Sequence, residues 1–209
     1  DAEELGPAYR NLALAYFDHL EQPEKAVRCM EKAFVLMPEN ARIFYELTQL
    51  YRAMNYSLEK RLSLYKENPA LVKSRDDCTL NYSILLTVEG KLQDAKDILL
   101  EHEFHTYEGG EGNLTRHHAW LQYLIGKSLF EQGDYSTATE ELCAGLVFPE
   151  CYGEEKTYFV NDAQLYYMLA LCCDKQGDDE GKEKYLLLAD STKDDVSIHT
   201  YFQCLACNA

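Results

Sequence analysis

Residues 124–149 read LIGKSLFEQGDYSTATEELCAGLVFP, and this stretch decides how the chain folds. An apolar helical pattern runs up to Gly133, the polar residue Asp134 follows, and a second amphipathic pattern begins at Tyr135. Glycine readily adopts the left-handed conformation that ends a helix. The stretch therefore predicts two helices joined by a short turn.

The same arrangement occurs at three further places in the chain. In each place a short turn follows an apolar helical pattern, with glycine at Gly90 and Gly177 and with Pro23 in the first. The three stretches are ALAYFDHLEQPEKAVRCMEKAFVLMP (13–38), YSILLTVEGKLQDAKDILLEHEF (82–104) and MLALCCDKQGDDEGKEKYLLLAD (168–190). Self-similar segments of this kind indicate a repeat protein, because one helix pair cannot bury its apolar face alone.

These stretches resemble the tetratricopeptide repeat (TPR) family, whose repeat is a helix–turn–helix of about 34 residues. The matching residues are Tyr9, Leu12, Ala13, Tyr16, Ala26, Met30, Ala33, Pro38, Phe44, Leu47, Tyr51, Leu64, Ser83, Leu86, Gly90, Ala95, Leu99, Ile125, Gly126, Leu129, Gly133, Tyr135, Ala138, Leu142, Tyr166, Leu169, Ala170, Gly177, Leu186 and Ala189. The resemblance covers nearly the whole chain. It implies an all-α fold, a right-handed α-α superhelix of about five TPR-like helix pairs with a C-terminal packing helix.

Small residues at matching places explain how the helices of a pair can approach closely. They are Ala13, Gly126 and Ala170 in first helices and Ala26, Ala95 and Ala138 in second helices. The repeat at 41–75 departs from this pattern, because Lys60 and Glu67 stand where the family has small residues. We therefore expect its second helix to pack less closely or to be shifted.

The alignment predicts one TPR-like repeat domain over residues 1–209. Its repeats lie near 6–40, 41–75, 76–103, 119–149 and 163–192, with inserted loops at 104–118 and 150–162 and a terminal helix at 195–207. Both loops fall between repeats, so we expect them on the same edge of the array, where insertions often mark the working side. Val196, Ile198, Phe202 and Leu205 are expected to cover the last repeat.

Composition limits the classes of partner. The net charge of −16 comes from 20 basic and 36 acidic residues. This argues against nucleic acid and anionic membrane surfaces, which attract Lys and Arg, and it suits an acidic exterior or a basic partner. No apolar run approaches the roughly 20 residues that cross a bilayer. The acidic start lacks both methionine and a signal segment, which suggests a piece of a longer protein.

Cysteine placement favours thiols over disulfides. Cys29, Cys143 and Cys172 fall in amphipathic helical patterns, where cysteine behaves as a small apolar residue. Cys204 and Cys207 form a C-x-x-C late in a helical pattern, which is weak evidence for a redox or zinc site. Reduced thiols indicate a cytoplasmic location.

The stretch FHTYEGGEGNLTR (104–116) interrupts the repeats and is a candidate site. It resembles a segment of large bacterial proteins that combine an N-terminal β-rich domain of unknown function with C-terminal tetratricopeptide repeats. That resemblance implies a link to carbohydrate metabolism, with the loop facing the β-rich domain or a shared glycan. The loop residues expected to bind are Phe104, His105, Tyr107, Glu108 and Glu111.

Other interpretations of this loop stay open. His102 and His105 are three residues apart, but the glycines that follow make a metal site improbable. The glutamates argue against a phosphate cradle. In a purely structural role, the aromatic residues pack the loop against the repeats, and Asn113 or Thr115 caps the next helix.

A stripe on the first helices of the repeats is the second candidate site, because the resemblance implies that these helices line an inner groove. The groove residues expected to bind are Arg10, Tyr45, Gln49, Arg52, Asn81, Trp120, Tyr123, Lys127 and Tyr167. Aromatic rings beside basic side chains suit a peptide, or a sugar stacked on a ring. The alternative is that several of these aromatics simply pack between helices.

The sequence therefore predicts a non-catalytic scaffold that binds a protein or peptide through the groove and the inserted loops. Neither a nucleophile elbow nor a dinucleotide-binding fingerprint occurs, and no cofactor or metal is expected. The alternative is an accessory domain of a larger bacterial carbohydrate-active protein, whose segment 102–120 contacts an adjoining domain or a glycan.

Overall fold

The computed structural model describes residues 2–106, 110–155, 161–191 and 198–207. All regular elements among these residues are helices, which confirms the predicted all-α fold class. The chain divides into two compact units, Asp1–Glu89 (unit 1) and Gly90–Ala209 (unit 2). The division falls between the two helices of the predicted repeat at 76–103.

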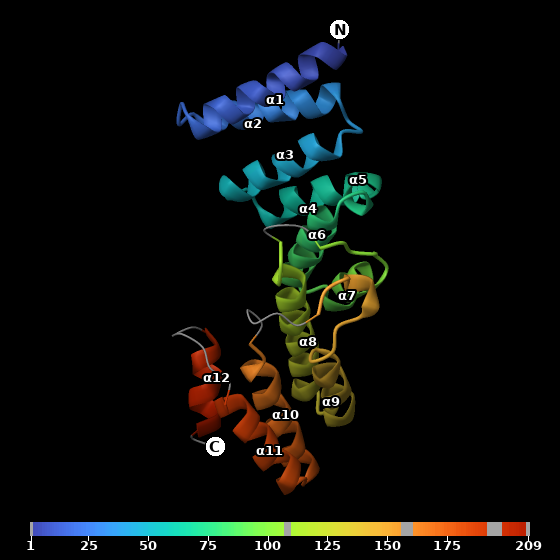
Figure 1. The fold of residues 1–209 in the computed structure, drawn as a ribbon, viewed down its shortest axis with the longest axis vertical. Helices are drawn as coiled ribbons and strands as arrows, with labels where there is room; N and C mark the ends of the chain where they lie inside the picture. The colour runs from blue at the N-terminus through green and yellow to red at the C-terminus, as the bar shows by residue number, and fades with distance from the viewer. Residues whose placement is uncertain (1, 107–109, 156–160, 192–197, 208–209) are drawn as a thin grey trace. The chain divides into compact units, whose positions relative to one another are not determined.

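Unit 1 contains the helix pairs α1–α2 and α3–α4, the short helix α5 and the single helix α6 (Figure 1). Its helices are α1 (Ala2–Asp18), α2 (Pro23–Leu36), α3 (Ala41–Ala53), α4 (Leu58–Glu67), α5 (Pro69–Lys73) and α6 (Asp76–Glu89). The first helix begins four residues before the predicted start of its repeat. Its core includes Ala13, Met30, Ala33 and Leu47, from α1, α2 and α3.

Unit 2 contains two helix pairs preceded by α7 and followed by α12 (Figure 1). Its helices are α7 (Leu92–Leu100), α8 (Asn113–Glu131), α9 (Tyr135–Ala144), the 3-10 helix η1 (Glu150–Tyr152), α10 (Ala163–Gln176), α11 (Asp179–Ser191) and α12 (Ile198–Cys207). Its core includes Ala138, Leu142, Leu165 and Leu169, from α9 and α10.

The predicted turns have the expected backbone conformation. Gly90, Gly133 and Gly177 adopt φ angles of 85°, 82° and 75°, in the left-handed region that glycine tolerates best. In the first pair, Glu21 takes φ 50° and Pro23 starts α2. Proline is well suited to the first turn of a helix, because its missing N–H would have no partner there.

Gly126 shows why small residues are required within a helix pair. A Cβ atom at this position would lie 2.5 Å from Cγ of Leu142, so any side chain here would displace α9 from α8. Ala13, Ala26 and Ala138 are likewise fully buried. The predicted close contact between paired helices is confirmed at these positions.

The predicted departure in the second repeat is also confirmed. The α3–α4 pair packs less extensively than the α1–α2 pair, and α4 also packs on α6. Lys60 stays exposed and does not pack between α3 and α4 as a small residue would. Its ammonium lies 4.5 Å from the ring centre of Tyr51 and 4.1 Å from that of Tyr56. The short helix α5 between α4 and α6 was not predicted.

One predicted boundary is wrong. The loop at 104–118 ends at Gly112, and α8 begins at Asn113, because Gly112 takes a left-handed φ of 73° and the first turn buries Leu114 and Thr115. The terminal helix was predicted from residue 195, and α12 begins at Ile198 within the described residues.

Candidate functional site

Three predicted groove residues of unit 2 meet in one aromatic stripe, defined here as Trp120 and Tyr123 of α8 and Tyr167 of α10. Trp120 and Tyr123 lie edge-to-face, with 5.4 Å between ring centres. The ring of Phe202, from α12, lies 6.2 Å from Trp120, 5.5 Å from Tyr123 and 6.3 Å from Tyr167. The predicted groove surface of unit 2 is therefore occupied by a side chain of the terminal helix.

The terminal helix α12 covers this stripe with only one of its faces. Phe202 is 7% exposed and Leu205 is half-buried, as predicted, whereas Ile198 is 58% exposed and does not cover the last repeat. Tyr201 touches the ring of Phe202 from the solvent side. Lys127 is exposed on α8 and lies 3.7 Å from Glu131. Burial raises the pKa of the Tyr123 phenol, which therefore stays neutral.

In unit 1, the predicted groove residue Arg10 is committed to an internal ion pair. Both oxygens of the Glu46 carboxylate accept hydrogen bonds from its guanidinium, and Arg42 also reaches Glu46 at 3.1 Å. This pairing raises the pKa of Arg10 and joins α1 to α3. Arg10 therefore serves packing between helices.

The ring of Tyr45 in unit 1 is stacked by an arginine, Arg75, which sequence patterns did not identify. The guanidinium of Arg75 lies 4.9 Å from the centre of the Tyr45 ring and donates hydrogen bonds to Asp77 at 2.9 and 2.6 Å. Arg75 stands in the turn before α6, where no helical periodicity marks it. Of the remaining predicted residues, Arg52 is exposed, and Gln49 and Asn81 are half-buried.

In unit 2, His118 of α8 joins this helix to the second inserted loop through Tyr152 of η1. The Nδ1 atom of His118 lies 3.0 Å from the Tyr152 hydroxyl, and its Nε2 lies 3.0 and 3.2 Å from the carbonyl oxygens of Ala144 and Val147. A carbonyl only accepts, so Nε2 carries the proton and Nδ1 accepts from tyrosine. Both ring nitrogens of His118 are therefore engaged in hydrogen bonds.

Further contacts hold the loop segments together. The Phe104 amide donates to the Cys151 carbonyl at 2.7 Å, and the Phe104 ring packs edge-to-face on Tyr152. The Glu154 carboxylate accepts from the backbone amides of Gly112 and Thr115, at the start of α8. Glu154 therefore takes the capping role expected of Asn113 or Thr115, since a carboxylate is favourable at a helix N-terminus.

The predicted loop residues have different environments. Phe104 is buried beneath Tyr152 and His102, so it packs the loop and offers no exposed ring. His105 and Glu111 are exposed. Tyr107 and Glu108 lie outside the described residues.

Metal-binding and redox chemistry would depend on clusters of metal ligands and on reactive cysteines among the described residues. Within residues 2–106, 110–155, 161–191 and 198–207, no group of three or more His, Cys, Asp or Glu side chains could hold a metal ion. All eight cysteines are thiols, as the helical placement predicted. The pKa of Cys207 is raised through its hydrogen bond with Asp190, which disfavours the reactive thiolate.

His117 makes stability depend on pH. Burial and the neighbouring His118 lower the pKa of His117 to about 4, below the usual value near 6.5. Between these values the unfolded chain binds more protons, so stability falls as pH falls. We expect unfolding free energy to drop by about 2 kcal/mol more in the wild type than in His117→Gln between pH 7 and pH 5. Urea unfolding followed by fluorescence measures the free energy of unfolding at each pH. If this free energy fell equally with pH in the wild type and in His117→Gln, the prediction would be wrong.

No family model matches the sequence. The structure is similar to YrrB, described as a TPR protein with an unusual peptide-binding site, with a TM-score of 0.57 and 15% identity over 96% of this chain and 91% of that one. The structure is also similar to MamA (41-end) from Desulfovibrio magneticus RS-1, with a TM-score of 0.51 and 11% identity over 87% of this chain and 91% of that one. For MamA MSR-1 C2 the TM-score is 0.50 and the identity is 13%, over 88% of this chain and 95% of that one.

At these identities the likeness establishes the fold alone, and it confirms the predicted tetratricopeptide-repeat fold. Nothing in the comparisons supports the accessory-domain hypothesis. Of the helices in the described part of the chain, none combines the length and hydropathy that a bilayer crossing requires.

Proposed function

We propose that this chain, which has the fold of tetratricopeptide-repeat proteins, is a non-catalytic scaffold that binds helical segments of partner proteins on its aromatic stripe. The observation that carries the proposal is the position of Phe202, whose ring lies against Trp120, Tyr123 and Tyr167. The terminal helix thus uses this stripe as a docking surface.

The chemistry of the stripe favours a segment that presents an aromatic or large aliphatic side chain. Aromatic rings in edge-to-face contact contribute roughly 0.5–1.5 kcal/mol per pair beyond the area they bury. Trp and Tyr also form rigid surfaces that lose little conformational entropy on binding. A segment with one well-placed ring can therefore gain most of its affinity here.

The helix that covers the stripe is suited to displacement. α12 has ten residues, and an isolated helix of this length is marginal in water. Its position therefore depends on the few side chains that it buries, chiefly Phe202 and Ala206. Segments held by few buried contacts open at low free-energy cost. A partner helix with a similar apolar face can compete for the same surface.

The polar groove residues of unit 1 are proposed to contact an extended segment. Tyr45, Gln49, Arg52 and Asn81 lie on α3 and α6, and Arg52 is exposed. An exposed guanidinium suits a carboxylate, and an amide side chain can bond the backbone of a bound peptide.

Binding of a free peptide tests the aromatic stripe. We expect a fluorescein-labelled peptide of residues 198–207, with its cysteines replaced by serine, to bind Phe202→Ala about tenfold more tightly than the wild type, because the mutation weakens the competing helix. Fluorescence anisotropy measures the affinity. The matched control is Tyr201→Ala, the exposed neighbour on the same helix, which should bind the peptide as the wild type does.

A second peptide makes the test specific to the ring. A peptide with alanine in place of the Phe202 residue should bind neither protein measurably. Equal binding of both peptides to Phe202→Ala, or no binding of either, would show that the stripe is not a docking surface.

A further inference from the structure

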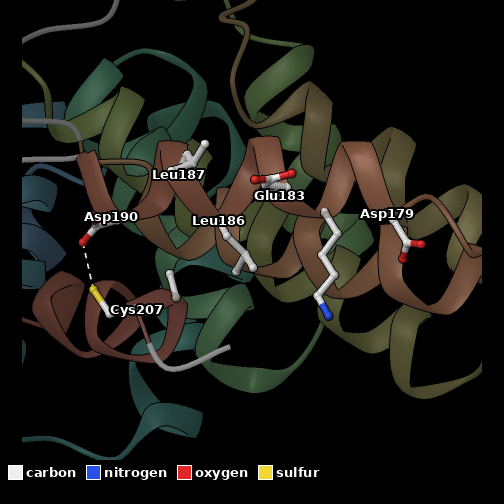
Figure 2. Close-up of a pocket in the computed structure, with 8 residues that line it drawn as sticks. Asp179, Glu183, Leu186, Leu187, Asp190 and Cys207 are labelled. Atoms are coloured by element: carbon white, nitrogen blue, oxygen red, sulfur yellow. Dashed lines mark hydrogen bonds between the residues drawn. The ribbon is translucent and has the colours of Figure 1, made fainter.

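A groove runs along α11 (Figure 2), and at one end it is closed by Ala206 and Cys207 of α12. Its volume is about 400 Å³, and Leu186 and Leu187 of α11 line it. Leu187 is 64% exposed. The groove contains none of the residues of the aromatic stripe, but Ala206 in its lining is one of the side chains that hold α12 in place.

The course of α12 explains why the groove is open. Its last residue, Cys207, donates a hydrogen bond to Asp190 at 2.8 Å, near the end of α11, as Figure 2 shows. Its Phe202 lies instead on the stripe of α8 and α10. α12 therefore covers only the end of α11, and the earlier turns, which carry Asp179 and Glu183, stay uncovered.

The charges around the groove are predominantly negative. Asp179, Glu183 and Asp190 all line it, spaced along one face of α11. The lysine in the lining, Lys182, donates to Asp174 of α10 at 2.9 Å, so a carboxylate already offsets its charge. An exposed leucine, Leu187, between carboxylates complements an apolar side chain flanked by cations.

We propose that this groove binds a basic amphipathic helix of a partner protein. An aliphatic side chain of the partner would contact Leu187, and lysines or arginines one and two turns away on one side of it would pair with Glu183 and Asp179. The net charge of −16 favours the approach of such a segment over an acidic one. Contact with Leu187 provides affinity, and the carboxylates favour a partner segment of positive charge.

A designed peptide tests the groove in the full chain. The probe is a fluorescein-labelled helical peptide of about 15 residues with leucines on one face and lysines elsewhere. We expect Glu183→Lys to weaken its binding about tenfold and Leu187→Ala about fivefold, because the two changes remove charge pairing and apolar contact respectively. Anisotropy titrations at 150 mM salt measure the affinities, and circular dichroism verifies that each variant is folded.

Matched variants separate the groove from general acidity. Glu140→Lys on α9 changes the net charge equally at another exposed carboxylate, and Val147→Ala shortens another exposed apolar side chain. Both should bind within twofold of the wild type, and a peptide with glutamates in place of the lysines should not bind. Equal weakening by Glu140→Lys and Glu183→Lys would overturn the proposal.

A second copy of the chain is the competing occupant. If sedimentation velocity showed a dimer that Leu187→Ala dissociates, the groove would be a self-association surface, and the proposal of a basic partner would fail. The variants Glu183→Lys and Leu187→Ala leave Phe202 and the residues of the stripe unchanged, so they test the groove separately from the stripe.

Discussion

Replacing Gly126 by leucine is expected to lower the free energy of unfolding by about 3 kcal/mol, because the new side chain has no space between α8 and α9. A Cβ atom here would lie 2.5 and 2.7 Å from side-chain atoms of Leu142 and 3.3 Å from the backbone oxygen of Ala138. Leu142 is fully buried and cannot turn towards solvent. The sole tryptophan, Trp120, lies on α8, so urea unfolding followed by its fluorescence reports this helix pair directly.

A double-mutant cycle makes this prediction specific. Leu142→Ala alone should cost about 3 kcal/mol through the cavity that it leaves. The double variant should lose about 1–2 kcal/mol less stability than the two single variants added together, since the cavity left by Leu142→Ala accommodates the larger side chain at residue 126. Lys127→Leu introduces the same side chain at the next, exposed position and should cost under about 0.5 kcal/mol. Strict additivity would mean that these residues do not face each other.

Replacing His118 by leucine is expected to destabilise the inserted loops and unit 2 by about 3 kcal/mol, since it leaves buried hydrogen-bonding partners unsatisfied. The Tyr152 hydroxyl and the Val147 carbonyl both lose their bond to the imidazole. Tyr152 is 2% exposed, so water cannot replace the histidine without rearrangement. Urea unfolding at pH 7, where the depressed pKa keeps His118 neutral, measures the loss.

Two further variants distinguish the hydrogen bond from general loop damage. His118→Leu combined with Tyr152→Phe should cost less than the two single changes added together, because no polar group then lacks its partner across this pair. His105→Leu changes an exposed histidine of the inserted loop before α8 and should stay within about 0.5 kcal/mol of the wild type. A large loss in His105→Leu would contradict the assignment of His118 as the group that joins α8 to the second inserted loop.

The aromatic stripe shows how far the groove could be predicted. The TPR resemblance placed Trp120, Tyr123 and Tyr167 on a common surface, and the structure brings them together. The sequence led us to expect Phe202 on the last repeat, but not its contacts with Trp120 and Tyr123 of the preceding repeat, because a helical pattern identifies an apolar face and not the surface that receives it. The same limit applies to Arg10, whose partner Glu46 is 36 residues away.

By itself the sequence determined the helix pairs, their turns and their close contacts. Apolar periodicity, left-handed glycines at 90, 133 and 177, and small residues such as Gly126 and Ala138 act within a few turns of chain, where spacing along the sequence fixes spacing in the structure. Tertiary structure alone decided that Glu154 caps a helix beginning 41 residues earlier in the chain and that His118 of α8 joins the loop after α9. It also decided that α12 covers the stripe and closes only one end of the groove along α11. Those contacts join residues far apart in sequence, and which of them meet depends on how whole helices pack.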